Sequence, residues 1–213
     1  HRQSSDNIDN ALLSYIEPYA SSACEMVSEV LQYIVDDIKI PNLEASSLYA
    51  GIMIDTNNFM NKTGVRTFEA AAFLRRSGAD ITLVRKMFRD DMESYRAKAQ
   101  IISSAKVYHN KYAIARGENL TIESPTIIGA QAANELLDIN EVKASFVLTT
   151  YNGRIYVSAR SIDEVNVQII MERLGGGGHM NASGAQFDHT DMDEAVADLK
   201  QVIDDVIEGG EIE

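Results

Sequence analysis

The residues with the clearest chemical potential are four successive glycines followed by a histidine, Gly175 to His179. Glycine has no side chain and reaches positive φ, so a ligand can approach the backbone N–H groups of Gly176, Gly177 and Gly178 closely, and the run can form a concavity for an anion. The ring of His179 can donate an N–H to a phosphate oxygen or stack on a base. The alternative is a flexible hinge with a surface histidine. The position of the run, inside a compact unit between a helix-like and a strand-like stretch, favours a ligand site.

Arg160 is a second candidate binding residue, because it ends a strand-like segment shortly before the glycines. Its planar guanidinium, with the hydroxyl groups of Ser158 and Ser161, can hold a phosphate or the edge of a base. The alternative is a surface pair between Arg160 and an acidic neighbour.

Asp55 is the best candidate for a metal ligand. It follows the apolar run 51–54, which we expect to be a strand, and ligands and metals bind at the carboxyl ends of strands in α/β sheets. A solvated strand-end aspartate is the alternative. One carboxylate cannot hold two metals, and the sequence suggests no Ser-His-Asp or Cys-His arrangement.

Arg66 and Thr67 follow a turn and open a predicted helix, whose N-terminus favours an anion. Arg66 is therefore a further candidate for contact with a phosphate. The alternative is that Thr67 caps the helix while Arg66 is simply exposed.

The composition indicates a folded protein that handles small ligands. Of the 213 residues, 45% are hydrophobic and 24% charged, with a net charge of −13. Scattered Lys and Arg argue against binding a long nucleic acid, which usually needs a basic stripe. No apolar run is long enough to span a membrane, and the single cysteine, Cys24, suits a reducing cytoplasm.

Hydrophobic patterning predicts an α/β protein. In the first part we expect strands at 12–16 and 51–54, and we expect helices at 23–38, 43–50, 67–77 and 80–88, followed by a connecting helix at 95–104. In the second part we expect hairpins at 107–115 and 146–160, the latter turning at Asn152-Gly153, and helices at 125–138, 165–174 and 191–208.

Several of these segments resemble the DHH/DHHA1 phosphoesterase family, and most closely its GdpP-type cyclic di-AMP phosphodiesterases. The opening stretch resembles the segment just after the Asp-His-His motif, with His1 as the second histidine of the motif. The stretch around Asp55 resembles the downstream metal-binding aspartate, and Val157–Ser161 and Gly175–His179, with Asn181 and Ala182, resemble the DHHA1 substrate-binding domain.

The resemblance implies an enzyme with two Mn²⁺ ions that activate water and convert cyclic di-AMP to linear pApA. It implies Asp55 as a metal ligand and catalytic residue and, less directly, His1 as a catalytic residue. It implies Gly176, Gly177, Gly178, His179, Ser158 and Arg160 as substrate contacts. The alternatives are a nanoRNase or oligonucleotide exonuclease of the DHH type, which acts on short oligonucleotides, and a nucleotide-binding regulatory module without catalysis.

The resemblance also implies an organisation. We expect the C-terminal part of a Rossmann-like DHH domain at 1–92, a helical linker at 93–105, and a DHHA1 domain with a mixed sheet flanked by helices at 106–213. Because the upstream metal-binding motifs of the family are absent, we expect a C-terminal fragment with an incomplete metal site and little activity alone. We expect this part to be cytoplasmic and without membrane contact, in a membrane-anchored parent protein, and we count a homodimer among its expected partners.

Overall fold

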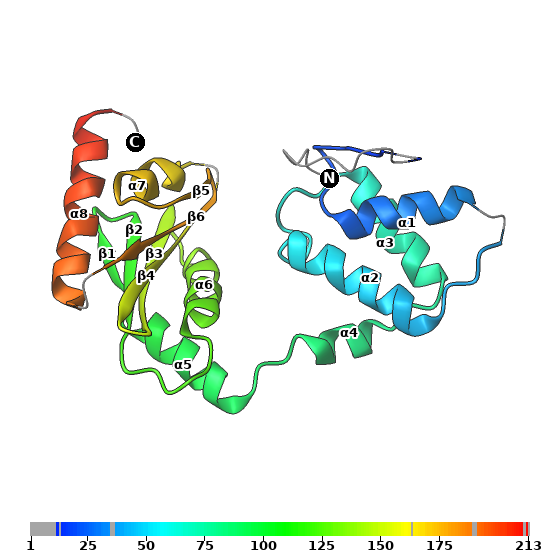
Figure 1. Cartoon of the computed structure of the whole chain (residues 1–213), viewed down its shortest axis with the longest axis horizontal. Helices are drawn as coiled ribbons and strands as arrows, with labels where there is room; N and C mark the ends of the chain where they lie inside the picture. The colour runs from blue at the N-terminus through cyan, green and yellow to red at the C-terminus, as the bar shows by residue number, and fades with distance from the viewer. Residues whose placement is uncertain are drawn as a thin grey trace. The chain divides into compact units, whose positions relative to one another are not determined.

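The computed structural model describes residues 12, 14–34, 37–162, 164–188, 191–210 and 212. The chain divides into two compact units, residues 1–89 and 90–213 (Figure 1). The described part of the first unit is helical, whereas the second unit combines a sheet with helices. No described helix has both the length and the apolar character needed to cross a membrane.

In the described part of the first unit, three helices pack around a small core, and a fourth, shorter helix follows. The core is formed by Ala45, Ile52, Ala70, Leu74 and Ala79. Gly51 lets two of the helices approach closely, since a Cβ atom there would lie only 2.3 Å from the Sγ atom of Cys24. The four helices are α1 (Ala23–Ile34), α2 (Asn42–Asp55), α3 (Val65–Arg76) and α4 (Ile81–Met87).

Two predicted strands in this unit are wrong. Residues 51–54 continue α2, so Asp55 ends a helix and not a strand. Short apolar runs do not distinguish a buried helix from a strand by periodicity alone, and Gly51 sits at a helix–helix contact where the absence of a side chain is required. In the predicted strand 12–16, residues 14–16 have no regular structure, and Leu13 lies outside the described residues.

The helix starts in this unit follow the sequence signals. The Oγ atom of Ser22 accepts a hydrogen bond of 3.0 Å from the backbone N–H of Glu25, which caps α1. The carboxylate of Asp80 accepts hydrogen bonds from the backbone N–H groups of Thr82 and Leu83, at 2.8 and 3.2 Å, and so caps α4. These short-range caps place both helices as predicted.

The second unit contains a six-stranded mixed sheet in the order β1-β2-β3-β4-β6-β5. Strands β2 and β3 are parallel, and the other neighbouring pairs are antiparallel. The predicted mixed sheet flanked by helices is therefore confirmed. The strands are β1 (Lys106–Tyr108), β2 (Tyr112–Gly117), β3 (Ala144–Tyr151), β4 (Arg154–Ser161), β5 (Gly177–His179) and β6 (Ala182–Phe187).

Helices cover both faces of this sheet. Helices α7 (Val167–Arg173) and α8 (Met192–Glu208) pack on the face that carries Phe146 and Leu148. Helix α6 (Pro125–Leu136) packs on the opposite face, which carries Val147 (Figure 1). Alternation along β3 thus supplies two separate apolar clusters, one on each side of the sheet.

Helix α5 (Met92–Ser103), which includes most of the expected linker, packs against the second unit. Its Ala97 and Ile101 are buried in the same cluster as α6. The apolar positions at a spacing of four residues give the helix one face that must be covered, which explains why it joins the sheet.

The hairpin between β3 and β4 turns at Asn152 and Gly153, which have φ values of 49° and 72°. Positive φ at both positions is the requirement of the two-residue turn predicted for an Asn-Gly pair. The turn sets the register that places Ser145 opposite Arg160 and Val147 opposite Ser158.

Candidate functional site

The glycine run ends in a paired edge strand. Gly177, Gly178 and His179 form β5, which pairs with β6. Two of the glycines allow this pairing, because a Cβ atom at Gly176 or Gly178 would lie 2.1 or 2.6 Å from a backbone oxygen of β6. Gly177 is different, since nothing lies within 4 Å of the position of its Cβ atom. In this run, Gly176 and Gly178 therefore allow close strand pairing, and Gly177 leaves open space above the sheet.

The register of three strands brings the predicted residues into two adjacent rows. Arg160 and His179 are both paired with Ala182, and Ser158 and Gly177 are both paired with Gly184. Residues directly opposite each other in antiparallel strands share a face of the sheet. We call the face that carries these two rows the open sheet face; it consists of Ser158, Arg160, Gly177, His179, Ala182 and Gly184.

Helix α6 packs over β3 and also contacts β4 on this face, whereas the edge of the sheet beyond β4 is more exposed. The Oγ atom of Ser145 donates a hydrogen bond of 2.6 Å to the backbone oxygen of Ala133 in α6, so β3 is covered. Toward the edge, Ala182 and His179 are exposed. On this face a small residue, Ala182, therefore lies between Arg160 and His179. Strand spacing of ~4.8 Å places these two residues about 10 Å apart at the backbone.

Arg160 is a half-buried cation. Its Nη1 atom donates a hydrogen bond of 2.9 Å to the backbone oxygen of Ala159, and no carboxylate of the described residues forms an ion pair with it. Burial lowers the pKa of its guanidinium below the usual value, although the group stays charged at neutral pH. A desolvated arginine without a carboxylate partner is suited to an anionic ligand. The predicted alternative, a surface ion pair, is not found among the described residues.

The exposed side chain of His179 is placed by the hairpin beneath it. The backbone oxygen of His179 accepts a hydrogen bond of 2.6 Å from the Oγ atom of Ser183, which faces the other side of the sheet. The residue belongs to an edge strand that has a neighbour on one side only. Its ring is therefore presented beside the open position of Gly177 instead of being buried in the apolar core.

Asp55 occupies the C-terminal end of α2, and its side chain is exposed. The following Thr56 is buried, and its Oγ1 atom donates to the backbone oxygen of Ile52 at 2.7 Å and accepts from the N–H of Phe59 at 3.0 Å. Burial, and secondarily the charge of Asp55, raise the pKa of the Cys24 thiol. Within the described ranges, no group of three or more His, Cys, Asp or Glu side chains could hold a metal ion. Asp55 can thus supply one carboxylate ligand to a metal ion. Its role as a metal ligand stays a prediction.

Arg66 lies at the start of α3, as expected, but its guanidinium has protein partners. Its Nε and Nη2 atoms bind the two carboxylate oxygens of Glu29 at 2.7 and 2.6 Å. Further hydrogen bonds join it to Tyr15 at 2.9 Å and to Glu17 at 3.4 Å. In place of the expected anion, two acidic residues of the same unit surround this arginine. The other predicted catalytic residue, His1, lies outside the described residues.

Sequence reasoning missed some residues of both units. Gly184 completes the second row of the open sheet face, and only the strand register identifies it. In the first unit, Tyr19, Phe59 and Lys62 line a groove next to the loop that follows Asp55. The available signal for that loop was the pair Asn57-Asn58, which tolerates a left-handed backbone.

Most of the second unit matches a known protein family. The family described as "DHHA1 domain" matches residues 111–208, so this part of the chain belongs to that family. The strands and glycine run of the open sheet face all lie within the matched residues. The resemblance predicted from the sequence is therefore confirmed.

Relatives extend the similarity beyond this domain. The chain is 43% identical over 99% of its length to the cyclic-di-AMP phosphodiesterase GdpP of Geobacillus thermodenitrificans, covering 32% of that protein. It is 40% identical over 96% of its length to the cyclic-di-AMP phosphodiesterase PdeA of Listeria monocytogenes, covering 31%. The chain thus spans about a third of the length of these relatives.

A weaker similarity is to a protein that is named for a different activity. It is 29% identical over 87% of its length to the bifunctional oligoribonuclease and PAP phosphatase NrnA of Mycoplasma genitalium, of which it covers 58%. Among solved structures, an exopolyphosphatase-related protein from Bacteroides fragilis has a TM-score of 0.82 at 24% identity, over 95% of this chain and 62% of that chain. The structural similarity supports the fold alone.

Proposed function

We propose that the whole protein is a metal-dependent phosphodiesterase that hydrolyses cyclic di-AMP to pApA, and that this chain binds the nucleotide on its open sheet face. The similarity to GdpP and PdeA supports the choice of substrate. The observation that carries the binding role is the row formed by Arg160 and His179 across Ala182. It combines an arginine that lacks a carboxylate partner with an exposed imidazole and a surface of small side chains.

Each residue of the open sheet face has a distinct part in this proposal. Arg160 holds a phosphate through two of its N–H groups, an interaction that is stronger in a partly desolvated setting than in water. His179 donates a ring N–H to a phosphate or stacks on a base. Gly177 and Gly184 keep the surface between them low enough for the ligand to approach the backbone, and Ser158 adds a hydroxyl group.

The metal requirement is part of the proposal, with Asp55 as one ligand. The described residues do not form a metal site by themselves, so the remaining ligands and the activation of water belong to other parts of the protein. Bound Mn²⁺ neutralises phosphate charge and lowers the pKa of a coordinated water. In the whole protein, Asp55→Asn should abolish Mn²⁺-dependent turnover, while Glu44→Gln, which changes an exposed acid of the same helix, should leave it unchanged.

A titration of the chain with cyclic di-AMP and with pApA, followed by calorimetry with and without Mn²⁺, tests the binding role. We expect binding without metal that His179→Ala weakens at least severalfold and that Met180→Ala, at an exposed neighbouring side chain, leaves unchanged. Equal affinity of the wild-type chain and His179→Ala for both ligands would contradict the proposal. We expect negligible hydrolysis of cyclic di-AMP by this chain alone.

The second candidate function is hydrolysis of short linear oligonucleotides, which the similarity to NrnA favours. The net charge of −13 is compatible with dinucleotides and unfavourable for long strands. A comparison of cyclic di-AMP with pApA as substrates of the whole protein separates the two. Faster turnover of pApA would favour the linear substrate.

A further inference from the structure

A cavity in the second unit lies apart from the open sheet face. Its volume is about 690 Å³, within the roughly 300–1,000 Å³ that is typical of small-molecule sites. Its lining residues come from the end of α5 and the turn that follows it, from β1 and β2, and from α8, which lies beside these strands in Figure 1. We call it the β1–α8 cavity, and the lining side chains that matter here are those of Lys106, Tyr108, Ile114, Arg116, Val196 and Lys200.

The β1–α8 cavity and the open sheet face lie on opposite faces of the sheet. Ile114 belongs to the apolar cluster that includes α8, and Lys106 is paired directly with Ile114, so both side chains are on the α8 side. The open sheet face is on the other side, because its Ser158 is paired with Val147, which belongs to the cluster with α6. A ligand in the cavity would therefore use residues that the proposed function does not.

Basic side chains from three elements line the cavity. Arg116 follows Ile114 by two residues, which makes it the diagonal neighbour of Lys106 on the same face, at about 7–8 Å. Lys200 comes from α8, and its Nζ atom lies 5.0 Å from the centre of the Tyr108 ring. Tyr108 is two residues along β1 from Lys106 and shares its face. Three cations thus surround one hollow in a chain whose net charge is −13.

The charge of these cations is only partly balanced by the protein. Of the described residues that line the cavity, one is acidic: Asp193, which is 84% exposed and forms an ion pair with Arg116. Within the described ranges, neither Lys106 nor Lys200 forms an ion pair. An anionic ligand can therefore replace one exposed carboxylate and gain two further cations.

The floor of the cavity is apolar, and its aromatic side chain is fixed. Ile114 and Val196 are 5% and 6% exposed, and both belong to the apolar cluster that includes α8. The hydroxyl group of Tyr108 donates a hydrogen bond of 2.7 Å to the carboxylate of Asp204, which is not one of the lining residues. The cavity thus offers an apolar floor to a carbon skeleton and positive charge to the anionic groups around it.

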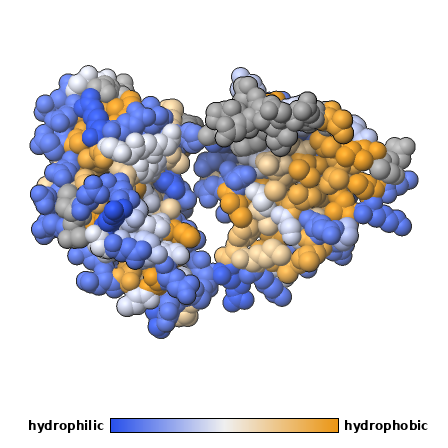
Figure 2. Space-filling model, in the orientation of Figure 1, coloured by the Kyte–Doolittle hydropathy of each residue, from blue (hydrophilic) through white to orange (hydrophobic). Residues whose placement is uncertain are grey.

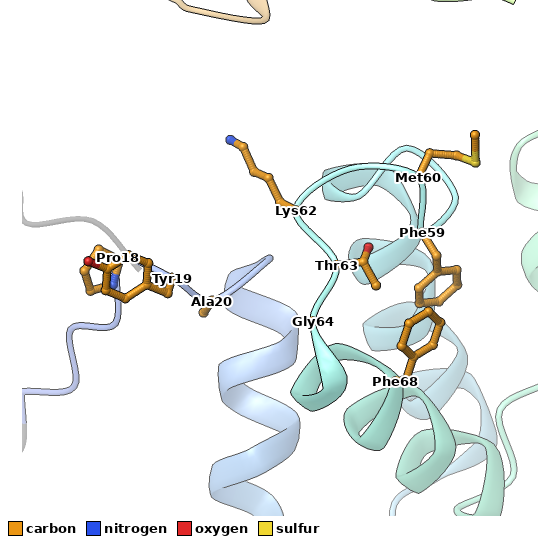
Figure 3. Close-up of a pocket in the computed structure, with 9 residues that line it drawn as sticks. All are labelled: Pro18, Tyr19, Ala20, Phe59, Met60, Lys62, Thr63, Gly64 and Phe68. Atoms are coloured by element: carbon orange, nitrogen blue, oxygen red, sulfur yellow. The ribbon is translucent and has the colours of Figure 1, made fainter. Parts of the chain in front are cut away.

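The groove in the first unit that Tyr19, Phe59 and Lys62 line differs in this respect. Figure 2 shows hydrophobic side chains gathered on the visible face of that unit, whereas the visible face of the second unit is mainly hydrophilic. In Figure 3 the Lys62 amine and the Tyr19 phenol point away from the rings of Phe59 and Phe68. The labelled polar and aromatic groups therefore do not face a common ligand, which makes the β1–α8 cavity the better candidate for a binding site.

We propose that the β1–α8 cavity binds a small organic polycarboxylate. One carboxylate takes the place of Asp193 on the guanidinium of Arg116, and a second lies between Lys106 and Lys200. The planar fork of arginine binds a carboxylate through two parallel hydrogen bonds, and the ion pair with Asp193 is formed with this same chemical group. A carbon skeleton, unlike an inorganic phosphate, also gains from contact with the apolar floor. The site is independent of the proposed function, so the two can fail separately.

Amide chemical shifts of the ¹⁵N-labelled full chain, titrated with citrate at constant ionic strength, test the proposal. We expect saturable shifts in residues 103–108 and 193–200, and we expect acetate at the same concentration of carboxylate groups to give none. Pyrophosphate, which has no carbon skeleton, should bind at least severalfold more weakly than citrate. Absent or non-saturable shifts in these residues, an equal response to acetate, or pyrophosphate binding as tight as that of citrate would each overturn the proposal.

Substitutions with opposite expected effects sharpen this test. Lys106→Gln and Lys200→Gln should each weaken citrate binding by on the order of tenfold, since each removes a charge-assisted contact. Asp193→Asn should strengthen it severalfold, because the competing carboxylate is lost. Lys143→Gln and Glu194→Gln, at exposed residues of the same unit, are the matched controls and should have no effect.

A parallel titration with pApA separates this proposal from the proposed function. The pApA response of residues 176–184 should be unchanged in Lys106→Gln and Lys200→Gln, which also shows that these variants are folded. Citrate affinity that is the same in wild type and in both variants, or citrate shifts confined to residues 176–184, would contradict the proposal. Absence of any response of the wild-type chain to pApA would contradict only the proposed function.

Discussion

Arg160 in β4 and His179 in β5 are both in register with Ala182 in β6, so a small side chain separates a half-buried cation from an exposed imidazole on one face of the sheet. The two residues lie on different strands, and the pairing of both strands with β6 brings them into one row. The relationship gives the open sheet face two groups that can bind one dinucleotide.

Removal of the Arg160 charge should weaken nucleotide binding. A charge-assisted hydrogen bond contributes about 1.5–3 kcal/mol, so we expect Arg160→Ala to reduce the affinity for pApA by roughly ten- to a hundredfold. Arg154→Ala, at an exposed residue of the same strand, is the control. Calorimetric titration measures both. An Arg160→Ala affinity within twofold of wild type would argue against the phosphate contact.

Neighbouring glycines should differ in their response to substitution. Gly176→Ala forces a Cβ atom to within 2.1 Å of the backbone oxygen of Gly184, and such overpacking costs about 1–3 kcal/mol. Gly177→Val has open space, so its free energy of unfolding should stay within about 0.5 kcal/mol of wild type, while its side chain obstructs the open sheet face and weakens nucleotide binding. Urea denaturation and calorimetry separate the two effects. The reverse pattern would mean that Gly177 serves pairing and Gly176 serves access.

Arg66 should stabilise the first unit without affecting nucleotide binding to the open sheet face. Its side chain is 45% exposed, so we expect Arg66→Ala to cost no more than about 1 kcal/mol. Arg66→Lys should recover little of this loss, because lysine cannot reproduce the two-point contact with Glu29. Thermal unfolding provides the measurement, with Arg76→Ala at an exposed residue of α3 as the control. A loss of affinity for pApA in Arg66→Ala would restore the predicted substrate contact.

Asp204 should contribute a pH-dependent increment of stability. Hydrogen bonds from His109, at 2.7 Å, and from Tyr108 lower the pKa of its carboxyl group. A lowered folded-state pKa stabilises the fold above the unfolded-state value of about 3.9, and the contribution is lost as the pH falls through the folded-state pKa. Asp204→Asn should therefore be less stable than wild type at pH 7.

The size of this effect is limited by solvent. The Asp204 side chain is 35% exposed, so we expect a difference of less than about 1 kcal/mol at pH 7 that disappears in acid. Denaturant titrations at several pH values, with Asp205→Asn on the same helix as the control, measure it. A difference that is the same at pH 7 and in acid would exclude the carboxylate charge as its source.

Features set by short-range interactions were predictable from the sequence. The Asn152–Gly153 turn and the Asp80 and Asp191 caps depend on residues within three or four positions of one another. Asp55 shows where such reasoning is insufficient. Its neighbours Ile52 and Ile54 suit a strand, and the contact of α2 with α1 at Gly51 holds them in a helix.

The candidate site was partly predictable for a related reason. Gly177, His179, Ser158 and Arg160 stand out by residue type, but their common face depends on strand register. The groove beside Lys62 depends on positive φ at Phe59 and Lys62 as well as at Asn57 and Asn58, and only the two asparagines are of a type that often adopts it. Strand pairing and backbone strain both depend on tertiary contacts, so they are difficult to predict from a single sequence.

The open space at Gly177 also makes the chain convenient for spectroscopy. The chain has a single cysteine, Cys24, and burial raises the pKa of its thiol, so little of the reactive thiolate is present at neutral pH. A cysteine introduced by Gly177→Cys would be the faster of the two to react with a maleimide dye. Nucleotide bound on the open sheet face would slow this reaction, so the rate of dye attachment, followed by absorbance, would report whether that face is occupied.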